Sequence, residues 1–384
     1  MAEETARPVA EETTEEITHV ELRHSPIHDQ HLGLGAKMAD FGGWSMPIEY
    51  PGGGVLKEHA AVREGVGLFD VSHLGKLKVT GARAIDFVNA QLTNDILRIA
   101  PGKAQYSMLC NDNGGVVDDL IVYWRADDDV LIIPNASNSA QVLATLEGAA
   151  PPSIALANQH QDFGVLAVQG PRSQTVLSAL GLGVELDYME FADAQWRGSP
   201  LTICRTGYSG ELGYELLPTW EQASELWDAL LPAVTASGGR PVGLGARDTL
   251  RTEMGYPLHG QDLSPEISPV QARLGWAVGW DKPQFCGRDA LLAEKRAGPS
   301  RRLWGLLATD RGIPRPHMQV MTADGEPVGE VTSGTFSPTL RRGIGLALLA
   351  EPLGPDDTVT VDIRGRPSTM TVVRPPFVDA STRS

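Results

Sequence analysis

The chain has 384 residues, 42% of them hydrophobic and 21% charged, and it carries a net charge of -16 at pH 7. This is the composition of a globular protein long enough for two or three domains. The acidic balance disfavours a nucleic-acid-binding protein, because such proteins present a basic face to the phosphates. No run of about eighteen apolar residues occurs, so no membrane-spanning helix is predicted.

The first 24 residues differ in composition from the rest of the chain. They contain seven glutamates against two arginines and few large apolar side chains. Such a segment cannot bury enough apolar surface to fold, so residues 1–24 are predicted to form a disordered acidic extension. They lack the basic start and apolar run of a signal peptide.

The cysteines and the first histidines give no metal or disulfide pattern. Cys110, Cys204 and Cys286 lie far apart and form no CxxC pair, which favours small core residues in a reducing cytoplasm. His28 and His31 have a spacing that suits a metal ion, but no third ligand is near them in the sequence. They are therefore predicted to be surface histidines, and no metal is expected.

The clearest local pattern begins at residue 76. Residues 76–79 predict a strand, and Thr80 is predicted to cap a helix that ends shortly before Asp95. A second strand is predicted over 104–109. The turn Asn111–Gly114 follows it, and its Asn-Gly pair predicts a hairpin.

The remaining chain mixes strands and helices without regular alternation. Residues 220–236 predict a long amphipathic helix, and a residue pattern of this mixed kind favours α+β domains with antiparallel sheets. Gly298–Ser300 is predicted to be a linker between domains. Residues 302–375 contain only short strands between Gly, Pro and Asp turns, which predicts a small β barrel or sandwich.

Several common catalytic and nucleotide-binding motifs are absent. Gly33–Gly35 and Gly243–Gly245 do not complete a GxGxxG pattern, and no Walker motif occurs. There is no GxSxG elbow, and Asp70, Ser72 and His73 are too close in sequence to form a triad by default. These absences argue against a Rossmann fold, a P-loop enzyme and a serine hydrolase.

Three carboxylates near the hairpin are candidate functional groups. Asp95 follows a predicted helix, where a carboxylate serves either as a loop cap or as a catalytic group. Asp118 and Asp119 are adjacent in a predicted strand. Their side chains should point to opposite faces, so they are not expected to form one paired acid site.

Two glycine-rich stretches offer a binding surface. In residues 206–215, Tyr208 and Tyr214 can stack on a ring, and Glu211 and Glu215 have the spacing of one strand face. A carboxylate there can accept two parallel N–H bonds from a guanidine-like edge. The alternative is an ordinary hairpin turn. Residues 243–251 open a helix whose Arg247 either binds an anion or planar ligand, or simply begins a surface helix.

Six motifs occur in a fixed order along the chain. They are FDVSH at 69–73, QLTND at 91–95, KAQYSMLCNDNGGVVDDL at 103–120, TGYSGELGYE at 206–215, GLGARDTLR at 243–251 and GEVTSGTFSP at 329–338. Together they resemble the aminomethyltransferases of the glycine cleavage system, the T-protein family. The resemblance extends from about Ser25 to about Asp379.

The resemblance implies a fold and a reaction. The fold is α+β, with three domains around a central channel: two α+β subdomains within residues 25–297 and a C-terminal β barrel over 301–378. The reaction moves the methylene carbon of an aminomethyl group, carried on the lipoyl arm of the H-protein, to tetrahydrofolate. The products are 5,10-methylene-tetrahydrofolate, ammonia and the dihydrolipoyl H-protein.

The resemblance also assigns roles to particular residues. Asp95 is expected to be catalytic, by positioning the folate amine or by taking its proton. The residues expected to bind folate are Glu215, Arg247, Tyr188, Met46, Tyr106, Asn111 and Asn113. The sequence departs from many relatives at Met189, where they have an aromatic residue, and after Phe377, where some have a tyrosine.

Other proteins of the same fold remain as alternatives. A folate-binding relative in iron–sulfur assembly typically has a cysteine shortly before a GQE motif, whereas residues 253–262 contain Gly-Gln without a cysteine. A folate-dependent demethylase of a small methylated substrate is the second alternative. The third is the folate half of a flavin-linked oxidoreductase, but no nucleotide fingerprint is present here.

Overall fold

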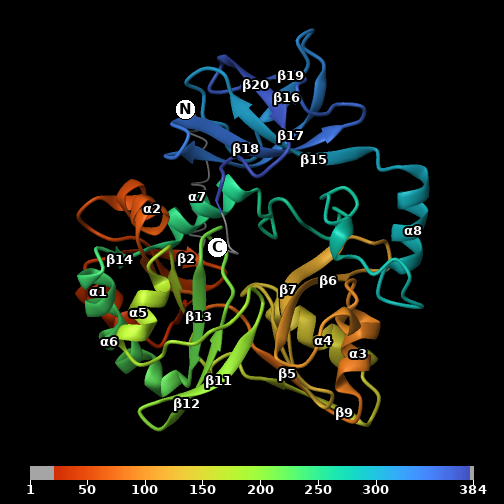
Figure 1. Cartoon of the computed structure of the whole chain (residues 1–384). Coiled ribbons are helices and arrows are strands. Elements are labelled where there is room, and N and C mark those ends of the chain that lie inside the picture. The colour runs from red at the N-terminus through yellow and green to blue at the C-terminus, as the bar shows by residue number, and fades with distance from the viewer. Residues whose placement is uncertain (1–20, 381–384) are drawn as a thin grey trace, which may run out of the picture.

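The computed structural model describes residues 21–380. Two sheets with helices on their outer sides form the lower body, and a β barrel lies above them (Figure 1). Most of the predicted acidic extension lies outside the described residues. Its last part is ordered, because Arg23–His24 form strand β1 and pair in parallel with Trp44 and Ser45 of β3. Among residues 21–380, regular structure therefore begins two residues before the predicted boundary of the ordered part.

The first sheet has five antiparallel strands in the order β6-β7-β8-β5-β9. The strands are β5 Leu77–Gly81, β6 Lys103–Cys110, β7 Val116–Ala126, β8 Asp129–Ile133 and β9 Ile154–Asn158. The predicted hairpin is confirmed, since the Gly114 N–H donates to the Asn111 carbonyl at 2.9 Å. Gly114 has a φ of +83°, a conformation that glycine adopts without steric cost.

Helices α3, Ala84–Gln91, and α4, Ser139–Ala149, cover the outer face of this sheet. Their buried residues, such as Val88 and Val142, pack on β5, β7 and β8. The predicted Thr80 cap is wrong. Thr80 lies inside β5, and Arg83 precedes α3 without a side-chain cap.

The second sheet has six strands in the order β11-β12-β13-β10-β4-β14. The strands are β4 Gly67–Asp70, β10 Leu166–Gln169, β11 Phe191–Trp196, β12 Ser199–Cys204, β13 Gly213–Pro218 and β14 Arg240–Pro241. Helices α5, Ser173–Ala179, and α6, Ala223–Ala236, cover its outer face. All four residues of β4 are buried, because both faces of this strand are covered: Leu68 packs in one core and Phe69 in the other.

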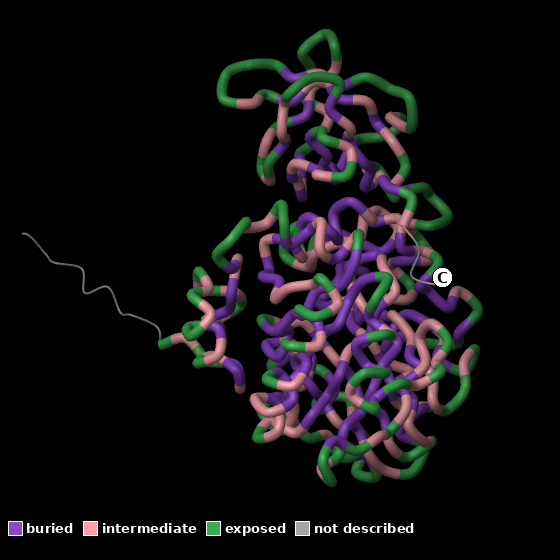
Figure 2. Tube along the Cα trace, turned by 60° about the vertical axis from the view of Figure 1, so that its left-hand side comes forward, coloured by how far each residue is buried: buried purple, intermediate pink, exposed green. Residues whose placement is uncertain are grey.

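The inner faces of the two sheets pack against each other, so the body has a helix–sheet–sheet–helix arrangement. Phe69 and Leu217 of one sheet share a core with Tyr123 and Leu131 of the other. The tube view shows this buried interior continuing through the body (Figure 2). Helices α2, Gly54–Glu64, and α7, Leu244–Met254, and the small sheet of β1, β2 and β3 complete this part. The remaining elements here are α1 His28–Gly33, β2 Lys37–Phe41, β3 Trp44–Glu49, η1 Ile96–Arg98, η2 Trp220–Gln222 and η3 Gly275–Ala277.

The C-terminal segment forms a closed barrel of six strands, which confirms the predicted β barrel. Helix α8, Arg288–Ala297, leads into it. The strands are β15 Arg301–Ala308, β16 Gln319–Met321, β17 Pro327–Ser337, β18 Arg342–Ala350, β19 Thr358–Asp362 and β20 Pro367–Val373. Closure removes the unpaired strand edges of an open sheet.

The prediction for His31 is wrong, because this side chain is fully buried. Its Nε2 lies 2.9 Å from Asp70 Oδ2, and its Nδ1 lies 2.8 Å from the Tyr50 hydroxyl. Burial alone would raise the pKa of Asp70, but the contact with His31 lowers it to about 2. Across residues 21–380, no group of three His, Cys, Asp or Glu side chains has the arrangement of a metal site, and no helix is long and apolar enough to cross a membrane.

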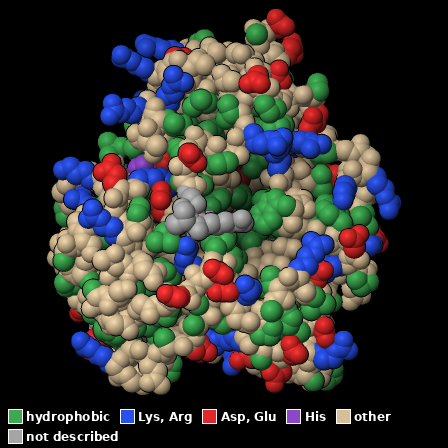
Figure 3. Space-filling model, viewed as in Figure 1, with side chains coloured by type: hydrophobic (Ala, Val, Ile, Leu, Met, Phe, Trp, Pro, Cys, Tyr) green, Lys and Arg blue, Asp and Glu red, His purple; other side chains and the backbone are tan. Residues whose placement is uncertain are grey.

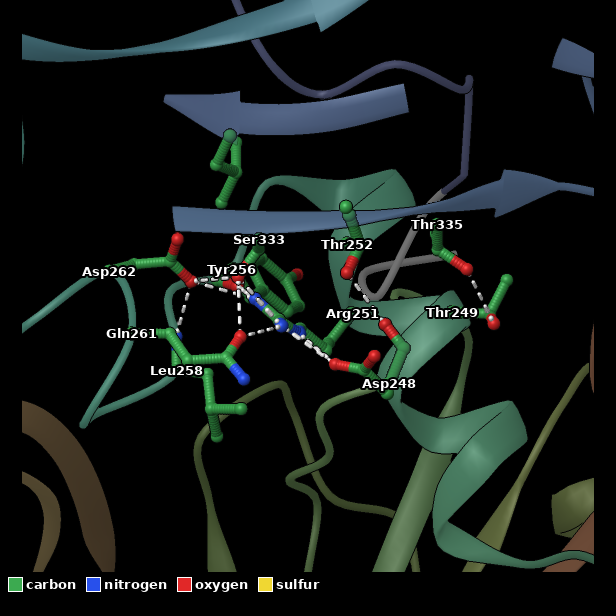
Figure 4. A network of polar contacts seen from close by, with 12 residues as sticks. Asp248, Thr249, Arg251, Thr252, Tyr256, Leu258, Gln261, Asp262, Ser333 and Thr335 are labelled. Carbon is green, nitrogen blue, oxygen red and sulfur yellow. Dashed lines mark hydrogen bonds and ion pairs between the residues drawn. The ribbon is translucent and has the colours of Figure 1, made fainter. Parts of the chain in front are cut away.

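A buried cation joins α7 to the barrel (Figure 4). Arg251 donates to Asp262 Oδ2 at 2.8 Å, to Asp248 Oδ1 at 2.6 Å and to the Ser333 hydroxyl of β17 at 2.9 Å. Asp262 also accepts the Leu258 N–H at 2.9 Å. The same network therefore fixes the loop after α7 and seats the barrel on the body.

We expect Asp262→Asn to destabilise the protein by about 3 kcal/mol, because it leaves the Arg251 charge short of a buried partner. Chemical denaturation would measure this loss. The matched control is Asp86→Asn, which removes an exposed pair with Arg83 and should cost less than about 0.5 kcal/mol. Equal stabilities of the two variants would contradict this role for the network.

Candidate functional site

A cavity of about 470 Å³ lies where the two sheets, α7 and the barrel meet. Its walls come from β6, β7, β8 and β13, from the loops 254–258 and 272–276, and from the barrel residues Leu303 and Leu346. The space-filling view shows a hollow at the centre of this face, with hydrophobic side chains on its rim (Figure 3). Cavities of this size, largely apolar with a few polar groups, are typical of small-molecule sites.

One wall of the cavity presents the carboxylate of Glu215 from β13. Glu215 Oε2 accepts a hydrogen bond of 2.5 Å from the Thr206 hydroxyl. Burial raises the pKa of Glu215, while the Thr206 hydrogen bond and the positive charge of Arg247 oppose that shift.

Arg247, from the first half of α7, lines the cavity together with Glu215. Its guanidinium carbon is 4.3 Å from the ring centre of Tyr208, a cation–π contact. Tyr208 donates its hydroxyl hydrogen to the Pro257 carbonyl and packs beside Tyr256. Arg247 is therefore part of the cavity wall and not a surface residue, and its planar group is held in place by an aromatic ring.

A second acidic group lies on β7. The Tyr106 hydroxyl donates to Asp119 Oδ2 at 3.0 Å, and the Asn135 amide donates 2.9 Å bonds to both Asp118 and Asp119. Burial raises the pKa of both carboxyl groups. As predicted from their adjacent positions, the two aspartates do not share the cavity wall, because Asp119 lines it and the fully buried Asp118 does not. The two carboxylates are nevertheless bridged by Asn135, which follows β8.

Aromatic rings form another part of the wall. Tyr106 stacks on Trp276, with ring centres 5.5 Å apart. Trp276 lines the cavity yet is 65% exposed, so the loop that carries it borders the open end. Tyr188 and Met189 also line the cavity, from the turn before β11. These flat and apolar surfaces suit a planar ligand.

Three of the predicted ligand contacts lie elsewhere. Met46 is fully buried in a small core with Trp44 and Leu244, because its strand packs under α7. Asn111 uses its side chain within the hairpin turn, where it accepts the Gly115 N–H and donates to the Pro265 carbonyl. Asn113 belongs to the same turn. None of the three lines the cavity.

The expectation that Glu211 and Glu215 lie on one strand face is wrong. Glu211 precedes β13 and forms a 2.9 Å ion pair with Arg63 of α2, so strand alternation does not apply to it. Tyr214 points away from the cavity and is buried in the core under α5 and α6. Of the four polar or aromatic residues expected to act together, only Tyr208 and Glu215 reach the cavity.

Asp95 lies beside the cavity and not in its wall. It caps η1, where its Oδ1 accepts the Leu97 N–H at 3.2 Å, and its Oδ2 lies 3.6 Å from Arg98 Nε. About a quarter of its side chain is exposed. Asn94 connects this loop to the wall, because its amide donates to the Tyr106 carbonyl at 2.9 Å. The capping role raised by the sequence is thus present, and the carboxylate stays accessible.

A buried lysine holds the loop that carries Asp95. The Lys282 ammonium donates to the carbonyls of Leu92 at 2.5 Å and Asn94 at 2.9 Å. Burial lowers the pKa of Lys282 to about 8, against the opposing charge of Asp95. The loop is further tied at Thr93, which bonds to Ala277 and Gly279. These contacts fix the direction in which the Asp95 carboxylate points.

The sequence did not identify several cavity residues. Trp276 lies in the short helix η3, and Arg273 and Arg374 lie outside helices and strands; none of the three segments has a periodic or motif signal. Asn135 follows a strand but resembles any loop asparagine until its bond to two aspartates is seen. Thr206 lies in the motif 206–215, immediately before its first glycine, and this position is a sequence signal for a hydroxyl donor.

Comparison with known proteins gives a consistent result over nearly the whole chain. A family model described as the GCVT N-terminal domain matches residues 27–282, and the glycine cleavage T-protein C-terminal barrel domain matches residues 301–379. An aminomethyltransferase of Frankia alni is 64% identical over 94% of this chain and 100% of the relative. One of Mycobacterium tuberculosis is 58% identical, over 94% and 99%.

A solved structure shares the fold. The crystal structure of glycine cleavage system aminomethyltransferase T from Bartonella henselae has a TM-score of 0.88 to this chain. It is 34% identical in sequence, and the match covers 94% of this chain and 99% of that one. The similarity therefore includes both the body and the barrel that enclose the cavity.

We expect Lys282→Met to loosen the loop 92–98, because two buried carbonyls lose their donor. The stability cost should be about 1–3 kcal/mol, and hydrogen exchange of the amides in this loop should become faster. The control is Lys295→Met, an exposed lysine whose ammonium lies 4.0 Å from the Trp280 ring centre. If both variants exchange equally in this loop, Lys282 does not anchor it.

Proposed function

The chain belongs to the T-protein (aminomethyltransferase) family of the glycine cleavage system, and from this we propose that its cavity binds tetrahydrofolate and that Asp95 serves the transfer reaction. The substrate would be the aminomethyl group on the dihydrolipoyl arm of the H-protein. The products would be 5,10-methylene-tetrahydrofolate, ammonia and dihydrolipoyl H-protein. The observation that carries the proposal is the half-buried Glu215 carboxylate in the wall of a cavity lined by aromatic rings.

Glu215 would recognise the pterin ring of the folate. The aminopyrimidinone edge of a pterin presents parallel N–H donors, and a fixed carboxylate accepts such a pair bidentately. Thr206 holds one oxygen of Glu215, which restricts its rotation before the ligand arrives. Arg247 and Tyr208 then provide a charged group and a ring face next to this carboxylate, and Tyr106 and Tyr188 extend the wall.

Asp95 would act on the folate amine that receives the carbon. This amine attacks an activated CH2 group as ammonia leaves, so it must lose a proton while positive charge develops at the carbon. A nearby carboxylate stabilises that charge and can accept the proton. The position of Asp95 at a loop beside the cavity, connected to Tyr106 through Asn94, supports this role.

The H-protein arm would reach the cavity from its open side, near the exposed Trp276. The proposed cellular location is the cytoplasm, where the three unpaired cysteines would stay reduced. The iron–sulfur assembly alternative remains disfavoured by the sequence, because the loop Leu258–Gln261 has no cysteine to act as a metal ligand.

One assay separates the enzyme from its demethylase alternative. Purified protein is mixed with tetrahydrofolate and aminomethylated, lipoylated H-protein, and ammonia release is followed. The proposal requires ammonia formation that depends on both partners. Transfer of a methyl group from a small methylated sulfonium without H-protein would support the demethylase instead.

We expect Asp95→Asn to lower kcat by at least about a hundredfold, the effect of losing a general base or a charge stabiliser. Folate affinity should change little, because the cavity wall is intact. Ammonia release and folate titration measure the two quantities. Asp86→Asn on α3 is the matched control and should retain normal turnover. A near-normal kcat for Asp95→Asn would refute this assignment.

Glu215 should make folate binding depend on pH. Its pKa is raised by burial, so as the pH falls this group protonates earlier than an ordinary glutamate and loses its negative charge. Affinity should then be full above the raised pKa and fall by up to about tenfold per pH unit below it. Glu215→Gln should bind more weakly at neutral pH and show a flatter profile. Parallel profiles of the two proteins would contradict the proposed contact.

A further inference from the structure

Gln169, the last residue of β10, has a buried polar side chain that does not line the large cavity. Its amide lies against the segment 206–214, which leads into Glu215. We propose that Gln169 is a positioning residue for ligand recognition: its amide shapes this segment and so fixes the direction of the Glu215 carboxylate. The inference rests on the proposed contact between Glu215 and the pterin ring of folate.

The amide of Gln169 bonds to the segment at its start, middle and end. Its Nε2 donates to the Thr206 carbonyl at 3.1 Å and to the Tyr214 carbonyl at 3.4 Å. Its Oε1 accepts a 2.8 Å hydrogen bond from the Ser209 hydroxyl. A glutamine amide offers N–H donors and one acceptor oxygen, and both kinds of group are used here. One side chain therefore ties together three points that are separated along the segment.

Two glycines of the segment allow the amide to approach so closely. A Cβ atom added at Gly207 or Gly213 would lie closer than 3.0 Å to the Gln169 amide, a distance that Cβ atoms essentially never show. Gln169 cannot move aside without breaking its three hydrogen bonds. The glycine-rich pattern of residues 206–215 is thus built around this amide, which belongs to a different strand.

The same bonds fix both partners of the contact between Thr206 and Glu215. The Thr206 hydroxyl holds Glu215 Oε2 at 2.5 Å, and Gln169 holds the Thr206 carbonyl. Gln169 also holds the carbonyl of Tyr214, the residue directly before Glu215. A second cavity, lined by Gln169, Glu215 and Arg247, has a volume of only about 10 Å³. The Glu215 carboxylate therefore has little room to turn toward β10.

A fixed carboxylate matters for this ligand because paired N–H···O bonds are directional. Both oxygens must lie near the plane of the pterin edge to accept its two donors. Restricting the carboxylate before the ligand arrives removes part of the ordering cost of binding. Gln169 supplies this restriction from outside the large cavity, so its loss should weaken recognition of the ring edge and leave the chemical step almost unchanged.

Gln169→Met tests this role, since methionine has a similar length but makes none of the three hydrogen bonds. The probes are tetrahydrofolate and its 2-desamino analogue, which lacks the amino group of the ring edge. We expect the unmodified protein to prefer tetrahydrofolate by at least about tenfold, and Gln169→Met to lose most of this preference. In the ammonia-release assay, KM for tetrahydrofolate should rise about tenfold while kcat stays within about twofold.

Gln174→Met is the matched control. Gln174 of α5 accepts a hydrogen bond from the Tyr214 hydroxyl and donates to the Val184 carbonyl at 3.1 Å, on the outer side of the same sheet. This variant should lose stability and keep the full ring preference. If Gln169→Met behaves in the same way, with lower stability and an unchanged ring preference, Gln169 is a structural residue and the proposal is overturned.

Two further measurements keep the test decisive. Should Gln169→Met not fold, Ser209→Ala removes one of the three bonds and should lower the ring preference about two- to fivefold; an unchanged preference would then contradict the proposal. In a Glu215→Gln background, either substitution should have little further effect, because both act on one contact, and full additivity would also contradict it. Equal affinity of the unmodified protein for the two ligands, or no binding of tetrahydrofolate, would instead refute the Glu215 contact of the proposed function.

Discussion

The architecture depends on one buried cation. Arg251 is 1% exposed at its side chain and is surrounded by Asp248, Asp262 and Ser333. A guanidinium removed from water in this way is stable only if nearly all its donors are paired. The partners come from α7, from the loop after it and from barrel strand β17, so satisfying one charge brings three parts of the chain together. The cavity is the space that this junction encloses.

The sequence predicted the architecture well where the signals are local. The Asn111–Gly114 hairpin, the amphipathic segment 220–236 and the C-terminal barrel all follow from turn chemistry and hydrophobic periodicity over a few residues. Errors arose where a residue's surroundings are set by distant parts of the chain. His31 appeared to be a surface residue, yet Asp70 and Tyr50 from other elements enclose it. Thr80 is a residue type that often caps helices, but it lies within strand β5.

The candidate site shows the same division between local and long-range information. Glu215, Arg247 and Tyr106 lie in the sequence motifs and Tyr188 is expected from the family resemblance, and the fold brings these four segments to one cavity. Met46, Asn111 and Asn113 were named as well, but packing and turn geometry use their side chains elsewhere. Neither Arg273 nor Arg374 belongs to a motif, so only the three-dimensional structure reveals that they approach the same wall.

Ligand recognition and the proposed chemistry are supported by different parts of the structure. Of the residues that would recognise folate, Glu215 and Tyr106 lie in strands and Arg247 lies in α7. Asp95 lies on a loop outside the cavity wall, and that loop is held by Lys282 and Thr93 through contacts with residues 277–282. A carboxylate that must meet a group carried in by another protein has to stay accessible, and a quarter of its side chain is exposed. On an unanchored loop, an accessible Asp95 carboxylate could change its direction. The buried ammonium of Lys282 holds this loop and so keeps the carboxylate in a fixed orientation.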